Sequence, residues 1–285
     1  MFYLIRNELI KMLCQKKNYV VIGGHLFMLG LCYLGFITSR MRFLERGLNR
    51  NVGIAFDDVM SYVDALFFAR AALIPTYFII FPIFICTIAG DIVAGEIQEG
   101  NLKLYASRAI SRQKIILSKL VSIFVVAFMY SCYFALANVV IGWIFFGPPG
   151  VQLIFMADIV GLATEMVIMP LPQAVECYIY AMLYFSFSVM ALGCITLFMS
   201  TLFNRMTTAT VAGITVYFVC YIVSAMPFGE EIRPYLLSTV INSVSIFWME
   251  RIPMGKLIDN ISMIGLYICV FSGLSLASFT LKDIR

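Results

Sequence analysis

Long apolar runs, separated by short polar segments, dominate the pattern of this chain. Six runs approach or exceed about 20 residues, the length that an α-helix needs to cross the hydrocarbon core of a bilayer. The pattern therefore predicts six membrane-spanning helices, at about 19–38, 71–90, 120–146, 177–203, 207–226 and 261–281. Pro75 and Pro82 fall inside the second run, where they predict a kink, and the sequence 147–150 (GPPG) ends the third.

The first 15 residues predict a helix of a different kind. Residues 1–15 (MFYLIRNELIKMLCQ) place apolar and polar side chains on opposite faces at helical spacing. Such a pattern is typical of a helix that lies in the membrane interface. The apolar face holds Ile5, Leu9, Met12 and Leu13, and the polar face holds Arg6, Asn7 and Lys11.

Two apolar stretches do not fit a count of six spans. Residues 151–169 contain Asp158 and Glu165, and an acidic residue at a helix centre costs about 2.5 to 3.5 kcal/mol on insertion scales. Residues 234–249 are uncharged but shorter than a span. A re-entrant or interfacial helical segment within 227–260, on the extracytoplasmic side before the last span, is the better interpretation of the second stretch.

Composition agrees with the pattern. The 285 residues are 62% hydrophobic and 13% charged, whereas soluble domains carry roughly 25% charged residues. The mean hydropathy is +0.94. The chain is therefore expected to be an all-α polytopic membrane protein with a single transmembrane domain over residues 1–285.

The sequence lacks the motifs that several kinds of catalytic and metal sites require. The eight cysteines form no CxxC pair, so neither a zinc site nor a redox motif is expected. With one histidine, no HExxH, no GxSxG and no GxxxxGK[ST], the chain offers no protease, esterase or P-loop ATPase site. We expect no enzyme activity, no metal, no cofactor and no nucleic-acid partner.

Basic residues predict the orientation. The N-terminal segment, residues 91–120 and the C-terminus together hold more lysine and arginine than the segments between them. Because these residues favour the cytoplasm, both termini and residues 91–120 are predicted to lie inside, with span one retained as an anchor. The expected location is the bacterial cytoplasmic (inner) membrane.

The six apolar runs contain no Asp, Glu, Lys or Arg. Ion-coupled carriers usually bind their proton or sodium ion through such groups inside the membrane. Their absence argues against secondary transport, so another protein is expected to supply the energy.

Residues 91–120 are a charge-dense island between two apolar runs. Within it, residues 100–112 (GNLKLYASRAISR) resemble the cytoplasmic signature G-T-L-x-L-L-L-S-x-P-x-S-R of permeases of the ABC-2 class of ABC transporters. The matching residues are Gly100, Leu102, Leu104, Ser107, Ser111 and Arg112, while Asn101 replaces the usual Thr and Ala109 the usual Pro. The layout of the whole chain is similar to this class, closest to its NosY and bacitracin-exporter type.

The resemblance implies a coupling helix at 91–112 that docks a separate ATPase subunit. Apolar anchors ringed by charges suit such docking, and Ser111 suits the cap of the next helix. The residues expected to couple the chain to the ATPase are Glu96, Glu99, Gly100, Leu102, Leu104, Arg108, Ser111 and Arg112. The resemblance further implies two ATPase copies that bind ATP and magnesium, a second permease copy, identical or homologous, and export of a substrate across the lipid bilayer.

Three residues outside the island stand out. His25 lies inside a span, where a titratable group is by default functional, yet Gly23 and Gly24 beside it favour close helix packing. A packing or interface role for His25 and a role toward substrate both stay open. Ala209 and Gly213 form a small-xxx-small pair suited to helix contact, within the chain or across a subunit interface.

Two alternatives remain. The island could be an ordinary basic inner loop that obeys the positive-inside rule and docks nothing. The chain could also be a non-transporting membrane scaffold or assembly factor that recruits a cytoplasmic partner through this loop. Co-purification of an ATPase would separate a permease from a scaffold.

Overall fold

The computed structural model describes residues 1–38, 63–100, 111–155, 166–226, 231–249 and 252–282. The protein is an all-α polytopic membrane protein: within the described residues, six helical stretches are long and apolar enough to span a membrane. The prediction of six spans is confirmed. The stretches are Lys17–Thr38 (α2), Ala65–Gln98 (α5, η1 and α6), Arg112–Phe146 (α8), Leu171–Leu202 (α9), Met206–Ala225 (α10) and Met254–Leu281 (α12).

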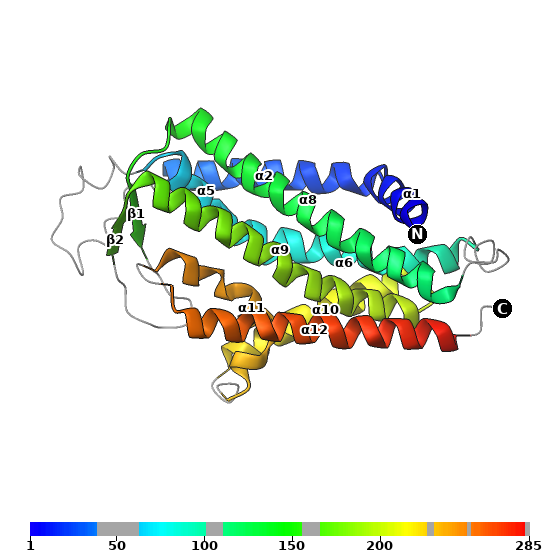
Figure 1. Ribbon diagram of the computed structural model, residues 1–285. Helices are drawn as coiled ribbons and strands as arrows, with labels where there is room; N and C mark the ends of the chain where they lie inside the picture. Colours follow the sequence, from blue (N-terminus) through cyan, green and yellow to red (C-terminus); the bar gives the residue numbers. More distant parts are fainter. Residues whose placement is uncertain (39–62, 101–110, 156–165, 227–230, 250–251, 283–285) are drawn as a thin grey trace.

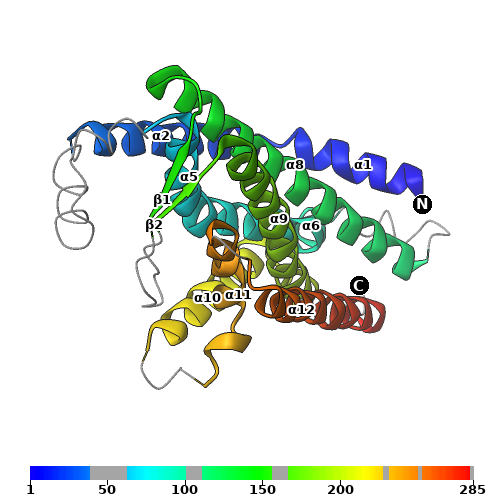
Figure 2. The ribbon, with the colours of Figure 1, turned by 60° about the vertical axis from the view of Figure 1, so that its left-hand side comes forward.

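The helices run lengthwise in an elongated bundle (Figure 1). The two ends of the chain lie at the same end of this bundle, as an even number of spans requires, and α6 ends and α8 begins there too (Figure 1). We call this the terminal end. Helix α9 lies at the centre, where it packs against α6, α8, α10 and α12. Figure 2 shows α2 and α12 on opposite sides of the bundle.

Two prolines shape the second span. α5 (Ala65–Pro75) is followed by a π-helical turn, η1 (Thr76–Ile80), and then by α6 (Phe81–Gln98). Pro82 has no N–H to donate to the carbonyl of Phe78, four residues earlier. The hydroxyl of Tyr217 in α10 donates to that carbonyl instead, at 3.2 Å. The predicted irregularity is therefore present, and a neighbouring helix satisfies the freed backbone group, as the membrane interior requires.

Three helices extend well beyond their apolar runs. α6 continues to Gln98, α8 already begins at Arg112, and α12 begins at Met254. Residues 91–98 and 112–120 are thus continuations of spans. Much of the island that the sequence favoured as a loop is helical, because charged side chains do not end a helix when neighbouring helices supply partners.

The end of the bundle opposite the terminal end carries short elements. β1 (Gln152–Phe155) pairs antiparallel with β2 (Met166–Met169), an element that the sequence did not predict. The Asp64 carboxylate joins this region to α5: it accepts hydrogen bonds from the backbone of Leu66 and Phe67 and from the backbone N–H of Gly150. It thereby caps the first turn of α5.

Within 227–260 the structure has η3 (Arg233–Tyr235), α11 (Leu237–Asn242) and η4 (Ser243–Trp248). α11 and η4 pack against α9, and α11 also contacts α10. The hydroxyl of Tyr184 donates to the carbonyl of Val240 at 2.6 Å. This short helical segment is therefore seated on the bundle.

Helix α1 (Phe2–Leu13) packs against α8 at the terminal end. Its buried residues are Glu8 and Met12, while Leu13, expected on the apolar face, is exposed. The side chains of Phe2 and Tyr3 are largely exposed, which suits contact with lipid at the membrane interface. The sequence placed no acidic residue on the buried side of this helix, and Glu8 corrects that assignment.

Candidate functional site

A buried ionic cluster joins three helices at the terminal end. We define it as the buried residues Glu8 of α1, Glu96 of α6 and Lys119 of α8, together with Lys11 of α1, whose side chain reaches Glu96 from the surface and is 41% exposed. The ammonium of Lys119 lies 3.1 Å from a carboxylate oxygen of Glu8 and 2.7 Å from one of Glu96. The ammonium of Lys11 lies 2.8 Å from the other oxygen of Glu96. Two lysines balance two glutamates, so the cluster has no net charge.

Burial makes the geometry of this cluster important. The side chains of Lys119 and Glu96 are each 1% exposed. A buried ion pair stabilises little relative to apolar packing, but removing one partner leaves a charge that neither water nor protein compensates. Because the partners lie on different helices, the cluster specifies how α1, α6 and α8 fit together.

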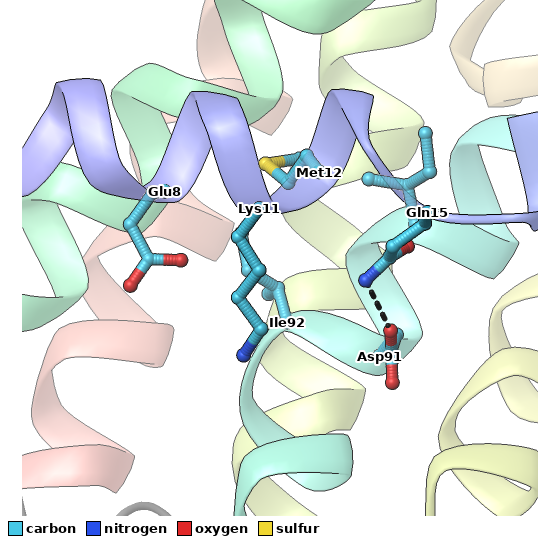
Figure 3. A pocket seen from close by; sticks show the side chains of 7 residues that line it. Glu8, Lys11, Met12, Gln15, Asp91 and Ile92 are labelled. Carbon is cyan, nitrogen blue, oxygen red and sulfur yellow. Dashed lines mark hydrogen bonds between the residues drawn. The ribbon is translucent and has the colours of Figure 1, made fainter.

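A second ion pair lies beside the first. The ammonium of Lys17 lies 2.9 Å from the carboxylate of Asp91, which also accepts a hydrogen bond from the Gln15 amide at 2.9 Å. Figure 3 shows Gln15 reaching down from the segment after α1 to Asp91 on α6, beside a small hollow lined by both helices. The Asn18 amide donates to the carbonyls of Met12 and Leu13 and so closes the end of α1.

These groups correct one inference from the sequence. The apolar runs lack charged residues, but the helices that contain them do not: Glu96, Asp91 and Lys119 all lie on membrane-spanning helices. In the structure each of these side chains has an ion-pair partner. The spans therefore do contain carboxylates, and ion coupling is not excluded by their absence.

Side-chain-to-backbone hydrogen bonds join the ends of α8, α9 and α12. The guanidinium of Arg112 donates to the carbonyls of Thr280 and Lys282, at 3.1 and 2.8 Å. The ammonium of Lys282 donates to the carbonyl of Thr201 at 2.7 Å. Cations at helix C-termini satisfy terminal carbonyls and complement the helix dipole. Partial burial lowers the pKa of Lys282 from its ordinary value.

The segment between α6 and α8 begins and ends at exposed residues. Gly100 has a φ of +75°, and the left-handed conformation that a glycine adopts readily ends α6. Glu99 and Gly100 are exposed, as are Ser111 and Arg112 where α8 begins. Ser111 occupies the N-cap position, but its side chain makes no capping hydrogen bond. The predicted docking residues Leu102, Leu104 and Arg108 lie outside the described residues.

The structure shows side-chain contacts of the predicted docking residues Glu96 and Arg112. Glu96 is buried in the ionic cluster, so it is not on a surface where a partner could reach it. Arg112 is exposed but donates to the end of α12. The structure therefore separates Glu96, which holds helices together, from Glu99, Gly100 and Ser111, which lie at the surface.

His25 lies in a contact between α2 and α8. Its side chain is fully buried, and its Nε2 lies 3.1 Å from the Asn138 side-chain oxygen. The rings of Phe134 and Tyr133 meet the imidazole edge-on, at 4.6 and 5.7 Å between centroids. This environment is that of a helix-packing residue.

Ala209 and Gly213 face neighbouring helices of the same chain. Ala209 is fully buried. A Cβ atom placed on Gly213 would lie 2.4 Å from the hydroxyl oxygen of Thr196 on α9. The small residues therefore allow α10 to approach α9 closely, and at Gly213 the contact is made within the chain.

No pattern in the sequence predicted the ionic cluster of Glu8, Lys11, Glu96 and Lys119, or the neighbouring pair of Lys17 with Asp91. Glu8 and Lys119 are 111 residues apart, so no local pattern could pair them. One signal was present: Lys119 stands between apolar residues in the stretch 115–124 (IILSKLVSIF). A lysine surrounded by apolar neighbours on a helix needs an acidic partner if it is buried.

Among the described residues, no group of histidine, cysteine or acidic side chains could hold a metal ion. A family model described as "Protein of unknown function (DUF2705)" matches residues 48–284. No curated protein matches the chain.

Proposed function

The chain belongs to the DUF2705 family, and we propose that it is the membrane permease subunit of an ATP-driven transporter. A separate ATPase would dock on the segment between α6 and α8, which we call the docking segment (residues 99–111). The observation that carries the proposal is the ionic cluster at the terminal end. It joins the helices on both sides of the segment to each other and to α1.

A docked partner can move the spans only through a segment that is fixed to them. A partner that pushes on an isolated loop moves only the loop, whereas a loop whose two ends are fixed in long helices transmits the movement to them. α6 and α8 are such helices, and the cluster prevents them from separating at the terminal end. The resemblance of residues 100–112 to ABC-2 permeases supports the same assignment from the sequence side.

The arrangement of the chain ends supports a cytoplasmic location for the docking segment. Both termini and both ends of this segment lie at the terminal end (Figure 1). ATP is available in the cytoplasm, so the terminal end would face inward, in the bacterial inner membrane. By the resemblance, two permease copies would assemble with two ATPase subunits and export a substrate.

ATP, rather than an ion gradient, is the energy source that fits the cluster. A coupling proton or sodium ion would bind a membrane carboxylate that is free to exchange it. Glu8 and Glu96 instead contact lysine ammonium groups at 3.1 Å or less. A coupling ion at either carboxylate would have to compete with Lys119, which is buried and would be left without its partner.

Co-purification with a matched charge exchange tests the proposal. Glu99→Lys with Arg108→Glu exchanges charges in the docking segment and keeps the net charge. Lys256→Glu with Asp259→Lys does the same on exposed residues of the first turns of α12, at the opposite end of the bundle. The native chain and the control should bring down an ATPase with a P-loop, and the docking variant should recover at least about tenfold less.

Each other outcome has a definite meaning. Equal recovery of the ATPase by both variants would show that the docking segment is assigned wrongly. If the native chain brings down a different cytoplasmic protein and no ATPase, the chain is a scaffold and not a permease. If both variants unfold at the same temperature as the native chain, the comparison is between folded proteins.

A further inference from the structure

Side chains of other helices form hydrogen bonds with the backbone of one turn of α6. We call residues 90–95 the Gly90–Gly95 turn. The hydroxyl of Ser200, on α9, donates to the carbonyl of Gly90 at 2.7 Å. The same oxygen accepts the N–H of Ala94 at 2.9 Å and that of Val93 at 3.3 Å.

In a regular α-helix the N–H of Ala94 would bond to the carbonyl of Gly90, four residues earlier. The Ser200 hydroxyl contacts both groups of this pair. Helix α6 is continuous through this turn, and a side chain that inserts into the backbone hydrogen bonds of a helix is a recognised cause of bending. Because a hydroxyl can donate and accept together, it can keep both groups bonded while they move apart.

Helix α8 also forms a hydrogen bond with this turn. The ammonium of Lys119 donates to the carbonyl of Ile92 at 2.8 Å, in addition to its contacts with Glu8 and Glu96. The turn is thus in contact with the ionic cluster. Any change in the position of Ile92 changes the geometry of the lysine that holds α1, α6 and α8 together.

The sequence of the turn favours bending. Glycine inside a helix destabilises it by about 1 kcal/mol relative to alanine, and this turn begins and ends with one. At Gly90 a Cβ atom would lie 2.9 Å from the backbone of Thr210 in α10. At Gly95 it would lie on the Asp91 carboxylate. A side chain that would stiffen the helix is therefore excluded at Gly90, whereas at Gly95 it would require the Asp91 carboxylate to move.

The turn separates two parts of α6. Residues 81–89 pack in the apolar core, where Phe81, Ile85 and Ala89 are fully buried. Residues 96–98 connect to the docking segment, and Gln98 accepts the N–H of Met206 at the start of α10. A bend at the turn would let the docking end of α6 move while the core part stays packed.

We propose that the Gly90–Gly95 turn is a joint through which docking of the ATPase bends α6, with Ser200 and Lys119 as positioning residues that keep its backbone hydrogen-bonded. The inference rests on the proposed function, since it assigns the movement that the ATPase drives. Buried backbone groups near a membrane cannot turn to water, so a joint there needs side chains that supply the bonds.

Amide hydrogen exchange tests the joint without knowledge of the transported substrate. The complex of the full chain with its ATPase is compared without nucleotide and with ATP trapped by orthovanadate. Exchange at Val93 and Ala94 should differ between the two states by about fivefold, the change that corresponds to one net hydrogen bond. In Ser200→Ala this nucleotide dependence should be lost, while the ATPase still co-purifies.

Ser188→Ala is the matched control. Ser188 is also fully buried on α9, but its hydroxyl donates to Tyr184 within its own helix. Ser188→Ala should keep the nucleotide dependence, and Ser200→Cys should restore part of it, because a thiol donates and accepts weakly. If Ser200→Ala fails to fold, the comparison of Ser200→Cys with the native chain replaces it.

Three results would overturn the proposal. Exchange at Val93 and Ala94 that is the same in both nucleotide states, in a complex that hydrolyses ATP, would refute the joint and leave the permease assignment intact. Equal behaviour of Ser200→Ala and Ser188→Ala would refute the role of Ser200. If no ATPase co-purifies with the native chain, the proposed function fails, and the joint fails with it.

Discussion

Replacing Lys119 by methionine is the most direct test of the ionic cluster. The substitution keeps an unbranched side chain of similar length and removes a buried charge shared by Glu8 and Glu96. Breaking a buried ion pair from one side costs about 3 to 5 kcal/mol, because the remaining charge is left uncompensated. A typical protein is stable by about 5 to 15 kcal/mol in total, so Lys119→Met should be severely destabilised.

Thermal unfolding of the purified chain in detergent, followed by tryptophan fluorescence, measures this effect. For chains of 150 to 250 residues, 1 kcal/mol corresponds to a shift in Tm of roughly 2 to 4 °C. Lys119→Met should therefore lower the Tm by roughly 6 to 20 °C. Lys114→Met is the matched control: it lies on the same helix, but its side chain is exposed. Its Tm should change by about 2 °C or less.

A double variant tests whether the charges act as a unit. Lys119→Met combined with Glu8→Gln removes one cation and one anion, and Glu96 keeps its contact with Lys11 at 2.8 Å. The double variant should be more stable than Lys119→Met alone, by about 1 to 3 kcal/mol. If Lys119→Met unfolds at the same temperature as Lys114→Met, or if the two cluster substitutions simply add, the cluster does not hold the helices together.

Three further substitutions test contacts elsewhere in the bundle. Tyr217→Phe leaves the Phe78 carbonyl without its donor and should cost about 1 to 3 kcal/mol in thermal unfolding, whereas Tyr180→Phe, at an exposed position, should have no effect. His25→Phe leaves the buried Asn138 amide without its partner and should destabilise by a similar amount; adding Asn138→Leu should restore stability if the pair only packs helices. Lys282→Met removes the donor to the last carbonyls of α9 and should speed amide exchange near the end of α12, with a loss of stability below about 1 kcal/mol.

The six spans could be predicted from the sequence because one physical constraint dominates them. A helix that crosses lipid needs about 20 consecutive apolar residues, and each observed span contains such a run. The end of α8 is also determined by neighbouring residues in the sequence. Gly147 adopts a φ of +84°, which glycine tolerates, and two prolines follow. Features set within a few residues of each other are readable in one sequence.

Helix ends and charge partners were not readable in this way. α6 and α8 continue through charged residues because distant parts of the chain neutralise them: Lys11 and Lys17 meet α6 from positions 74 or more residues away. The antiparallel pairing of β1 with β2 likewise depends on contacts between separate segments. A charge in the sequence predicts a loop only when nothing folds over it, and that condition is tertiary.

The buried charges bear on how the docking segment and the spans communicate. A purely apolar contact between α1, α6 and α8 would tolerate small sliding movements, since dispersion and hydrophobic contacts have little directionality. The contacts with Glu8, Glu96 and the carbonyl of Ile92 are directional, and the one ammonium group of Lys119 makes all three. A displacement of residue 96 must therefore either move α1 and α8 with it or break an ion pair of the cluster. The lower-energy response is for α1, α6 and α8 to move together at the terminal end, with the bend in α6 taken up at the Gly90–Gly95 turn.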